Sequence, residues 1–341
     1  MSIDKEVNFK DLAMIFAALL SDGSIQKNRI ASFTNKDIEL IKAFKNSYKS
    51  FFHLSEDKFK GNWNKSEFEN KIMTIKIHSK EIVNFLLNFS KFKHNPTRNK
   101  GIKIYPVAHI PEMIFNGNKK LKYVFLKMYA SCDGCIEVSI RYPRSAKKYD
   151  VIGNVVFACE NPTLNLDLFN LLKSLAYTPI RDVKRVRLTR IKDIIKFENE
   201  CGFIEGCKIF KSGHGAHFYN EEKNKILKLL VYLLKAGIPK NLSKVFRSHD
   251  NKNQIKKYLI FLLDEIKKGE KLPKIKFKQG KTTLNIEEKK WILSKKLFRK
   301  NIKSNKKYIL PATKILKHFK KKFKKNIDVT TIYWYWTRFR K

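Results

Sequence analysis

The sequence predicts an α+β fold in which two similar units form one pseudo-twofold domain, followed by a C-terminal helical region. The first observation is a stretch that occurs twice, at 15–25 and 126–136: a mostly apolar, small-residue helix that ends in Asp-Gly and runs into a β-like segment. The second is an α-β-β-α-β-β-α order of elements in each copy. The third is a change to helical periodicity after Glu221.

These observations divide the chain into three regions. The first repeat covers residues 1–105, the second covers 106–215, and a basic, helical region covers 216–341. Each repeat is expected to place one antiparallel sheet with a polar, cationic face beside its partner's sheet.

Apolar spacing assigns the elements of the two repeats. In the first repeat we expect helices over 8–21, 36–52 and 81–89 and strands over 24–34 and 71–78, with a loop or hairpin over 54–70. In the second we expect helices over 119–132 and 166–175, strands over 136–140, 155–159 and 185–189, a basic tip over 141–150, and a helix at 193–197 that echoes 81–85.

The C-terminal region has helical spacing over 226–234, 255–266 and 286–298, with a basic linker between the last two. Two further helices, 311–323 and 329–339, flank a short break, which resembles a helix-turn-helix. In that arrangement Thr330, Thr331 and Arg338 would contact DNA. The alternative is a lysine-rich helical tail packed on the core.

The charge predicts a polyanionic partner, because 73 Lys and Arg face 31 Asp and Glu, a net charge of +42. An anionic membrane is the rival partner, but no apolar run approaches the roughly 20 residues of a membrane helix. The N-terminus is polar and lacks the apolar core of a signal peptide. We therefore expect a cytoplasmic, nucleoid-associated protein.

The two Asp-Gly pairs suggest a metal site. A glycine after the last helical residue is expected to adopt the left-handed conformation that ends a helix. The carboxylates of Asp22 and Asp133 would then lie beside unpaired carbonyls at the negative ends of two helices, where they repel each other unless a cation intervenes. Cys132, Cys135, Cys201 and Cys207 could instead hold zinc, but a buried thiol is the better interpretation of Cys132.

The pair of motifs resembles the two signature helices of single-chain LAGLIDADG (DOD-type) homing endonucleases. Ala17-Ala18-Leu19-Leu20-Ser21-Asp22-Gly23-Ser24-Ile25 is similar to the usual pattern. Phe125-Leu126-Lys127-Met128-Tyr129-Ala130-Ser131-Cys132-Asp133-Gly134 is similar to the second-copy form. The resemblance covers about residues 8 to 215 and implies a duplicated αββαββα domain whose antiparallel sheets form a saddle on double-stranded DNA, acting as a monomer.

The resemblance also implies a chemistry. Asp22 and Asp133, with the carbonyls of Ser21 and Cys132, would hold Mg²⁺ or, alternatively, Mn²⁺, for hydrolysis of both DNA strands across the minor groove, leaving 3′ overhangs. Lys36 matches the basic catalytic position, with Asn35 beside it. The second copy departs from the pattern, because Glu160 stands where Lys or Gln is expected, which predicts unequal cleavage of the two strands. Met128 stands where the family prefers Gly.

The DNA-binding candidates are polar residues on the expected sheet faces and tips. They are Lys27, Arg29, Asn35, Thr74, Lys76, His78, Arg141, Arg185 and Arg187. The preferred function is a site-specific DNA endonuclease, intron-encoded for homing or free-standing. The alternatives are an intron maturase that binds RNA, a transcription regulator that binds DNA without cutting it, and a structural basic protein of the ribosome or chromatin.

Overall fold

The computed structural model describes residues 5–26, 29–63, 71–92, 97–99, 102–141, 150–210, 218–236, 251–268, 287, 299–300, 307–308 and 319–323. The chain divides into two compact units, Met1–Ile275 and Lys276–Lys341. In the second unit, the described elements are the paired strands β11 (Arg299–Lys300) and β12 (Lys307–Tyr308) and a helical segment at 319–323.

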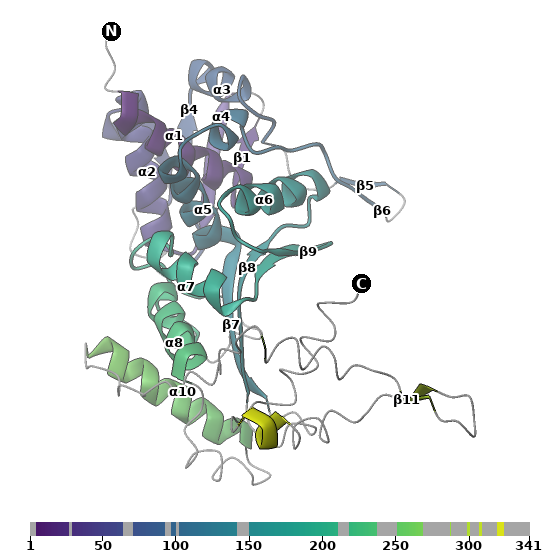
Figure 1. The fold of residues 1–341 in the computed structure, drawn as a ribbon. Coiled ribbons are helices and arrows are strands. Elements are labelled where there is room, and N and C mark those ends of the chain that lie inside the picture. The colour runs from purple at the N-terminus through teal and green to yellow at the C-terminus, as the bar shows by residue number, and fades with distance from the viewer. Residues whose placement is uncertain are drawn as a thin grey trace. The chain divides into compact units, whose positions relative to one another are not determined.

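Two helices that pack side by side form the centre of the first unit (Figure 1): α1 (Lys5–Leu20) and α5 (Lys119–Asp133). The C-terminal halves of both helices contain small residues, of which Ala17, Ala18 and Ala130 are fully buried. Small side chains allow two helix backbones to approach closely, which brings the C-terminal ends of the two helices together.

The first repeat builds a four-stranded antiparallel sheet in the order β1-β2-β4-β3. Its strands are β1 (Gly23–Gln26), β2 (Ile30–Asn35), β4 (Met73–His78) and β3 (Phe59–Gly61). The helices α2 (Ile38–Phe52) and α3 (Lys80–Leu87) pack on it. Phe33 and Ile75, which pair across β2 and β4, are fully buried, so the alternation of apolar and polar residues sets which face the helices cover.

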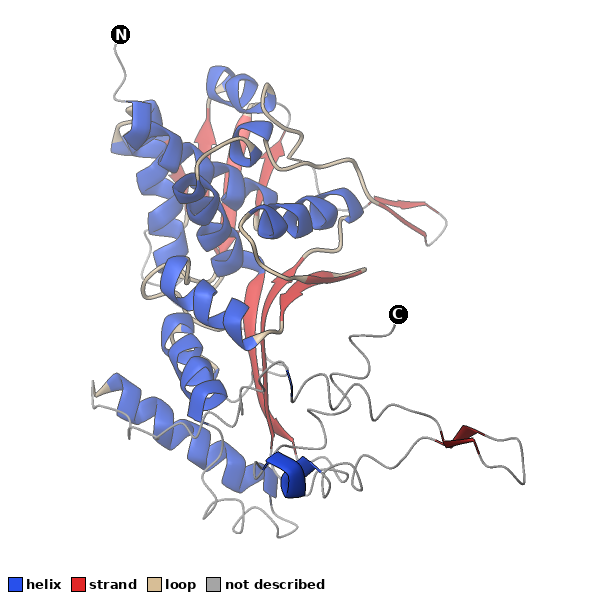
Figure 2. Ribbon diagram, viewed as in Figure 1, coloured by secondary structure: helices blue, strands red, loops and turns tan. Residues whose placement is uncertain are grey.

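The second repeat has the same strand order, β7-β8-β10-β9. Its strands are β7 (Gly134–Arg141), β8 (Asp150–Ala158), β10 (Arg185–Leu188) and β9 (Ile180–Asp182), and its helices are α6 (Pro162–Ser174) and α7 (Ile191–Glu200). β7 and β8 pair along a long ribbon (Figure 2). The predicted duplicated α+β fold with antiparallel sheets is confirmed.

The glycines that follow the central helices do not act as expected. Gly134 has φ −92° and ψ 155°, an extended conformation, and neither Gly23 nor Gly134 has a positive φ. A Cβ on Gly23 would lie 2.6 Å from the Leu19 Cα, and one on Gly134 would lie 2.3 Å from the Ala130 carbonyl oxygen. The expected left-handed turn is therefore wrong: each strand begins directly at the glycine and passes so close to its own helix that a side chain has no room.

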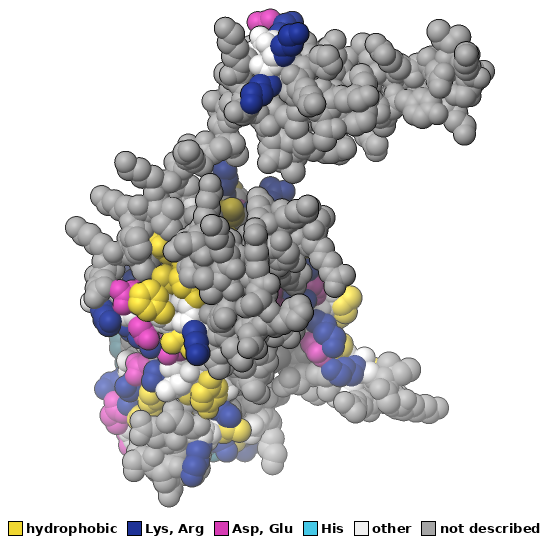
Figure 3. All heavy atoms as spheres, turned by 90° about the horizontal axis from the view of Figure 1, so that it is seen from below, with side chains coloured by type: hydrophobic (Ala, Val, Ile, Leu, Met, Phe, Trp, Pro, Cys, Tyr) yellow, Lys and Arg dark blue, Asp and Glu magenta, His cyan; other side chains and the backbone are white. Residues whose placement is uncertain are grey.

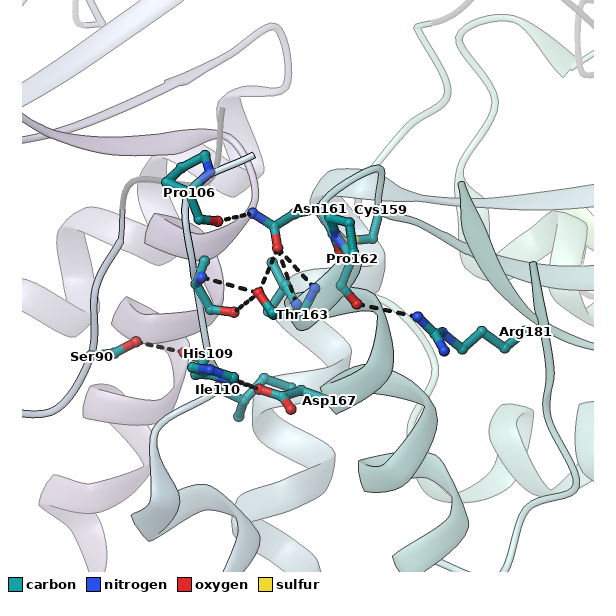
Figure 4. Close-up of polar contacts among 12 residues, drawn as sticks. Ser90, Pro106, His109, Ile110, Cys159, Asn161, Pro162, Thr163, Asp167 and Arg181 are labelled. Carbon is teal, nitrogen blue, oxygen red and sulfur yellow. Dashed lines mark hydrogen bonds and ion pairs between the residues drawn. The ribbon is translucent and has the colours of Figure 1, made fainter. Parts of the chain in front are cut away.

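The connection between the repeats is held by the start of α6 (Figure 4). After the short hairpin of β5 (Thr97–Asn99) and β6 (Ile102–Ile104), the Asn161 amide donates to the Pro106 carbonyl at 2.8 Å. The Thr163 hydroxyl accepts from the Ala108 N–H at 3.1 Å and donates to the Ala108 carbonyl at 2.8 Å. The connection then enters α4 (Glu112–Phe115).

Beyond the repeats, α8 (Lys223–Ala236) packs on β7 and β8, and α10 (Asn251–Lys267) packs on α8. A Cβ on Gly153 of β8 would lie 1.9 Å from the Leu230 Cδ1, so the sheet lacks a side chain where α8 lies against it. The first compact unit thus includes both helices, although the third region was expected to start at residue 216. The expected helix-turn-helix lies almost entirely outside the described residues.

No helix among the described residues is long and apolar enough to cross a membrane.

Candidate active site

Asp22 and Asp133 lie at the boundary between two clefts, and both residues line both of them. The first cleft, of about 520 Å³, is lined by residues of both repeats and includes Asn35 and Lys36. The second cleft, of about 840 Å³, runs along the second sheet and includes Glu160 and Arg185. The structure thus brings the two expected carboxylates to one place, with one cleft on each side.

The charges of both carboxylates affect the pKa values of two buried side chains, Cys132 and Tyr129. Burial raises the pKa of the Cys132 thiol well above its ordinary value, and the charges of Asp22 and Asp133 raise it further. The same causes raise the pKa of Tyr129, whose hydroxyl donates to the Ala158 carbonyl at 3.2 Å. Cys132 therefore stays a neutral thiol, and only its carbonyl can serve as a ligand for a hard cation.

In the first cleft, Asn35 positions Asp22. The Asn35 amide donates to the Asp22 Oδ2 at 2.7 Å, while its own oxygen accepts from the Asp37 N–H at 2.8 Å. The Thr34 N–H also donates to the Asp22 carbonyl at 3.2 Å. Asn35 was expected to contact DNA, and in this structure its amide holds a carboxylate. Lys36 follows it in the lining of the same cleft.

Lys208, which the sequence did not single out, also lines the first cleft. It comes from the segment after α7 of the second repeat, and its N–H donates to the Asp37 Oδ2 at 2.6 Å. Asp37 is 3% exposed and also caps the N-terminus of α2, so this one carboxylate joins the two repeats. Lysine is so frequent in this sequence that position along the chain alone does not single out Lys208.

In the second cleft, Glu160 is the counterpart of Lys36. The glycine after each central helix pairs with a phenylalanine of the next strand, Gly23 with Phe33 and Gly134 with Phe157. Lys36 and Glu160 each lie three residues after that phenylalanine. The Glu160 carboxylate accepts from the Lys103 ammonium at 2.6 Å and from the Tyr105 hydroxyl at 2.8 Å. These bonds, followed by that from Lys184, lower its pKa from 4.5 to about 2. The second cleft therefore obtains its cationic groups from neighbours of Glu160.

The donor set at the two aspartates suits a hard cation. Two carboxylates and the carbonyls of Ser21 and Cys132 offer oxygen ligands only, while the Ser21 hydroxyl donates to the Ala17 and Ala18 carbonyls at 2.8 and 3.2 Å. In the described part of the chain, no three His, Cys, Asp or Glu side chains lie close enough together to hold a metal ion. The cysteines considered for zinc therefore form no such group there. Mg²⁺ bound by one or two carboxylates keeps several waters, so these residues fit that ion.

The polar face of the first sheet carries hydroxyl and basic groups. The hydroxyls of Ser24 and Ser32 lie 2.8 Å apart, and those of Thr34 and Thr74 lie 3.1 Å apart. Lys60 and Lys76 pair across β3 and β4. The described residues of this face are Ser24, Gln26, Ile30, Ser32, Thr34, Lys60, Thr74, Lys76 and His78, and none of them is acidic.

The polar face of the second sheet carries an ion-pair network instead. Arg185 donates to Glu137 at 3.1 Å and to Asp182 at 3.1 Å, and Arg187 lies 3.3 Å from Asp182. The Asn154 amide donates to Glu137 at 2.6 Å. Arg185 and Arg187, two of the arginines predicted to bind DNA, are thus held by carboxylates.

The remaining candidates are placed as follows. Arg29 directly precedes β2, and its carbonyl accepts from the Ser79 N–H. His78 ends β4 with an exposed side chain. Arg141 ends β7. Lys27, Thr330, Thr331 and Arg338 lie outside the described residues.

Comparisons with known proteins give structural similarity only. No protein-family model matches the chain, and no curated protein matches it in sequence. Full-length DUF199/WhiA from Thermatoga maritima is 14% identical with a TM-score of 0.39, over 99% of this chain and 92% of that chain. I-SmaMI bound to an uncleaved DNA target with calcium ions is 16% identical with a TM-score of 0.39, over 74% and 97%. The homing endonuclease I-WcaI bound to its DNA recognition sequence is 14% identical with a TM-score of 0.34, over 57% and 80%.

Proposed function

We propose that the protein is a Mg²⁺-dependent endonuclease that hydrolyses one phosphodiester bond in each strand of duplex DNA. The observation that carries the proposal is the placement of Asp22 and Asp133, from the ends of two packed helices, at the boundary of two clefts. A duplex presents two scissile phosphates, and one cleft on each side of a shared pair of carboxylates supplies a place for each.

Asp22, Asp133 and the carbonyls of Ser21 and Cys132 would hold the ion. Bound Mg²⁺ would supply an activated water and neutralise charge on the phosphate. Asn35 fixes the Asp22 carboxylate through its 2.7 Å bond, and the Lys36 and Lys208 side chains give the first cleft positive charge. Such preset charges stabilise the negative charge that develops as the phosphodiester bond breaks.

The two clefts would cut at different rates. The first cleft has Lys36, whereas the second has Glu160, a carboxylate already bound to Lys103 and Tyr105. A negative charge near a phosphate disfavours the transition state, so we expect the strand in the first cleft to be cut faster.

Double-stranded DNA is the proposed partner for two reasons. The chain has a net charge of +42, which favours a polyanion, and its two sheets have polar faces that could contact a duplex. Since both motif copies lie in one chain, a monomer would carry a complete site.

The test uses the full chain with Mg²⁺ and duplexes from the locus that encodes it, with and without the coding element. We expect cleavage of one form only. Asp22→Asn or Asp133→Asn should abolish double-strand cleavage or convert it to nicking, with DNA binding retained, and Asp57→Asn on the exposed surface is the matched control. Full cleavage by the Asp22→Asn, Asp133→Asn double variant would overturn the assignment, and binding by the wild type without any cleavage would favour a regulator.

A further inference from the structure

A buried lysine from outside the two repeats lies against the end of α5. Lys223, the first residue of α8, is 5% exposed. Its ammonium donates to the Ser131 carbonyl at 2.6 Å and the Gly134 carbonyl at 2.9 Å, with the Ala130 carbonyl at 3.5 Å. An ammonium has three N–H donors, so each has a carbonyl within reach.

The backbone around Lys223 is fixed independently of its side chain. The Lys223 N–H donates to the Cys207 carbonyl at 2.7 Å. The next residue, Asn224, exchanges two hydrogen bonds with the backbone of Phe203, at 2.9 and 3.0 Å. The Phe203 ring also lies 5.6 Å from the Lys223 ammonium. The start of α8 therefore delivers a positive charge to one defined point.

That point is the negative end of a helix dipole. The last four carbonyls of a helix lack intrahelical partners and together act as about half a negative charge. The carbonyls that Lys223 contacts flank Asp133, the last residue of α5. Lys223 also lines the first cleft together with Asp22 and Asp133.

The end of α1 is held differently. The Ser21 hydroxyl donates to the Ala17 and Ala18 carbonyls, and the Asn35 amide donates to Asp22. These donors are neutral, whereas Lys223 brings a positive charge to the carbonyls at the end of α5.

We propose that Lys223 is a positioning residue that acts as an internal cation for the Asp133 half of the site. Its charge offsets the repulsion of Asp133 by the α5 carbonyls and by Asp22, so both carboxylates stay in place before a metal binds. The link to metal binding rests on the proposed function. The electrostatic coupling to Asp133 does not.

The coupling is tested by thermal unfolding of the full chain without divalent metal. Lys223→Gln keeps neutral donors and removes the charge, and Lys223→Met also removes the donors. We expect Lys223→Gln to lower Tm by several degrees in the wild-type background and by much less in the Asp133→Asn background, because the repelled carboxylate is then absent. Asp57→Asn, on the exposed surface, is the matched background in which the full fall should remain.

An equal fall of Tm in the wild-type and Asp133→Asn backgrounds would overturn the proposal and leave Lys223 as a donor to carbonyls only. If Lys223→Met fails to fold, the comparison of Lys223→Gln in the wild-type and Asp133→Asn backgrounds still tests the coupling.

A second measurement titrates Mg²⁺ against each chain. Since Lys223→Gln has lost its internal cation, we expect Mg²⁺ to raise its Tm more than it raises the wild-type Tm. Equal gains would overturn the metal part of the inference. If Mg²⁺ raises neither Tm, the proposed metal-dependent function fails, while the coupling measured without metal stands on its own result.

Discussion

The Asp22 carboxylate has a fixed orientation because Asn35 binds one of its oxygens and is itself held by the Asp37 N–H. Groups that orient a metal-binding side chain typically contribute 10- to 100-fold to activity. Asn35 sits at the end of β2, where its side chain is only partly buried. Its substitution should therefore affect the site more than the fold.

We expect Asn35→Ala to lower single-turnover cleavage by about 10- to 100-fold, with a change in Tm of no more than a few degrees. Asn88→Ala, at the exposed end of α3, is the control and should change neither quantity. A variant that cuts at the wild-type rate would show that Asp22 needs no orienting partner.

The pKa of Glu160 gives a prediction with a defined sign. Its folded value of about 2 lies below the ordinary value of 4.5, so the interactions with Lys103 and Tyr105 stabilise the fold above pH 4.5 and are lost as the pH falls through 2. The wild type should therefore exceed Glu160→Gln in Tm at neutral pH, with a difference that shrinks as the pH falls from about 4.5 toward 2. The difference should be small, because the carboxylate is 41% exposed. A difference that is constant from neutral pH to pH 2 would contradict this account.

At the scale of elements, the two sheets share their topology but differ in the chemistry of their polar faces. The first face offers hydroxyls and lysines, which suit phosphate contacts. The second offers Arg185 and Arg187, held by Asp182 and Glu137, and a guanidinium held in place loses less entropy when it forms a bidentate bond to guanine. Among the residues that the structure describes, the buried Arg187 Nε has no hydrogen-bond partner, so this side chain gains a bond if it rearranges on DNA.

A matched pair of substitutions tests this difference. Asp182→Asn removes one negative charge and the ion pairs that Asp182 makes with both arginines, while Arg185 keeps its partner Glu137. We therefore expect tighter binding to random duplex and weaker discrimination among sequences. Lys76→Gln on the first face should weaken binding to all sequences alike and lower the salt slope by about 1. Binding selections from a randomised duplex library, with each variant, provide the measurement. If Asp182→Asn discriminates among DNA sequences as well as the wild type, the ion pairs with Asp182 do not contribute to sequence specificity.

The elements that alternate or repeat clearly were predictable from sequence, and those fixed by distant contacts were not. The strands at 73–78 and 185–188 follow from alternation, and the helices α1 and α5 follow from the repeated small-residue stretch that ends in Asp-Gly. β3 and β9 have three residues each and too little alternation to detect. Of the site, Asp22 and Asp133 were predictable because each ends a recognisable helix, whereas Lys208 and Lys223 reach it through folding of the whole second repeat and α8.

At the scale of the whole molecule, the described surface mixes charged and apolar side chains. On the face shown in Figure 3, described Lys and Arg side chains are interspersed with Asp and Glu and with exposed apolar side chains. The first compact unit extends to Ile275, and α8 covers the β7–β8 ribbon with apolar residues such as Leu230, which is fully buried. The repeats alone would leave this surface in water.

We therefore expect a chain ending at Ile275 to fold with a cooperative transition, and a chain ending at residue 215 to lose several degrees of Tm or to aggregate, because it lacks α8 and Lys223. Thermal unfolding and size-exclusion chromatography of the two truncated chains provide the comparison. A chain ending at residue 215 that is as stable as the longer one would show that α8 contributes little to the fold.

The clasp between Asn161, Thr163 and the connection at Pro106 and Ala108 also limits how the protein could be recombined with others. The segment that joins the repeats contains Lys103 and Tyr105, which both donate to the Glu160 carboxylate of the second repeat. By its contacts, this segment therefore belongs to the second repeat. A hybrid protein built by exchanging halves at residue 105 would separate Lys103 and Tyr105 from Glu160. The exchangeable module is the second repeat together with the hairpin that precedes it, and a crossover before Thr97 keeps that module whole.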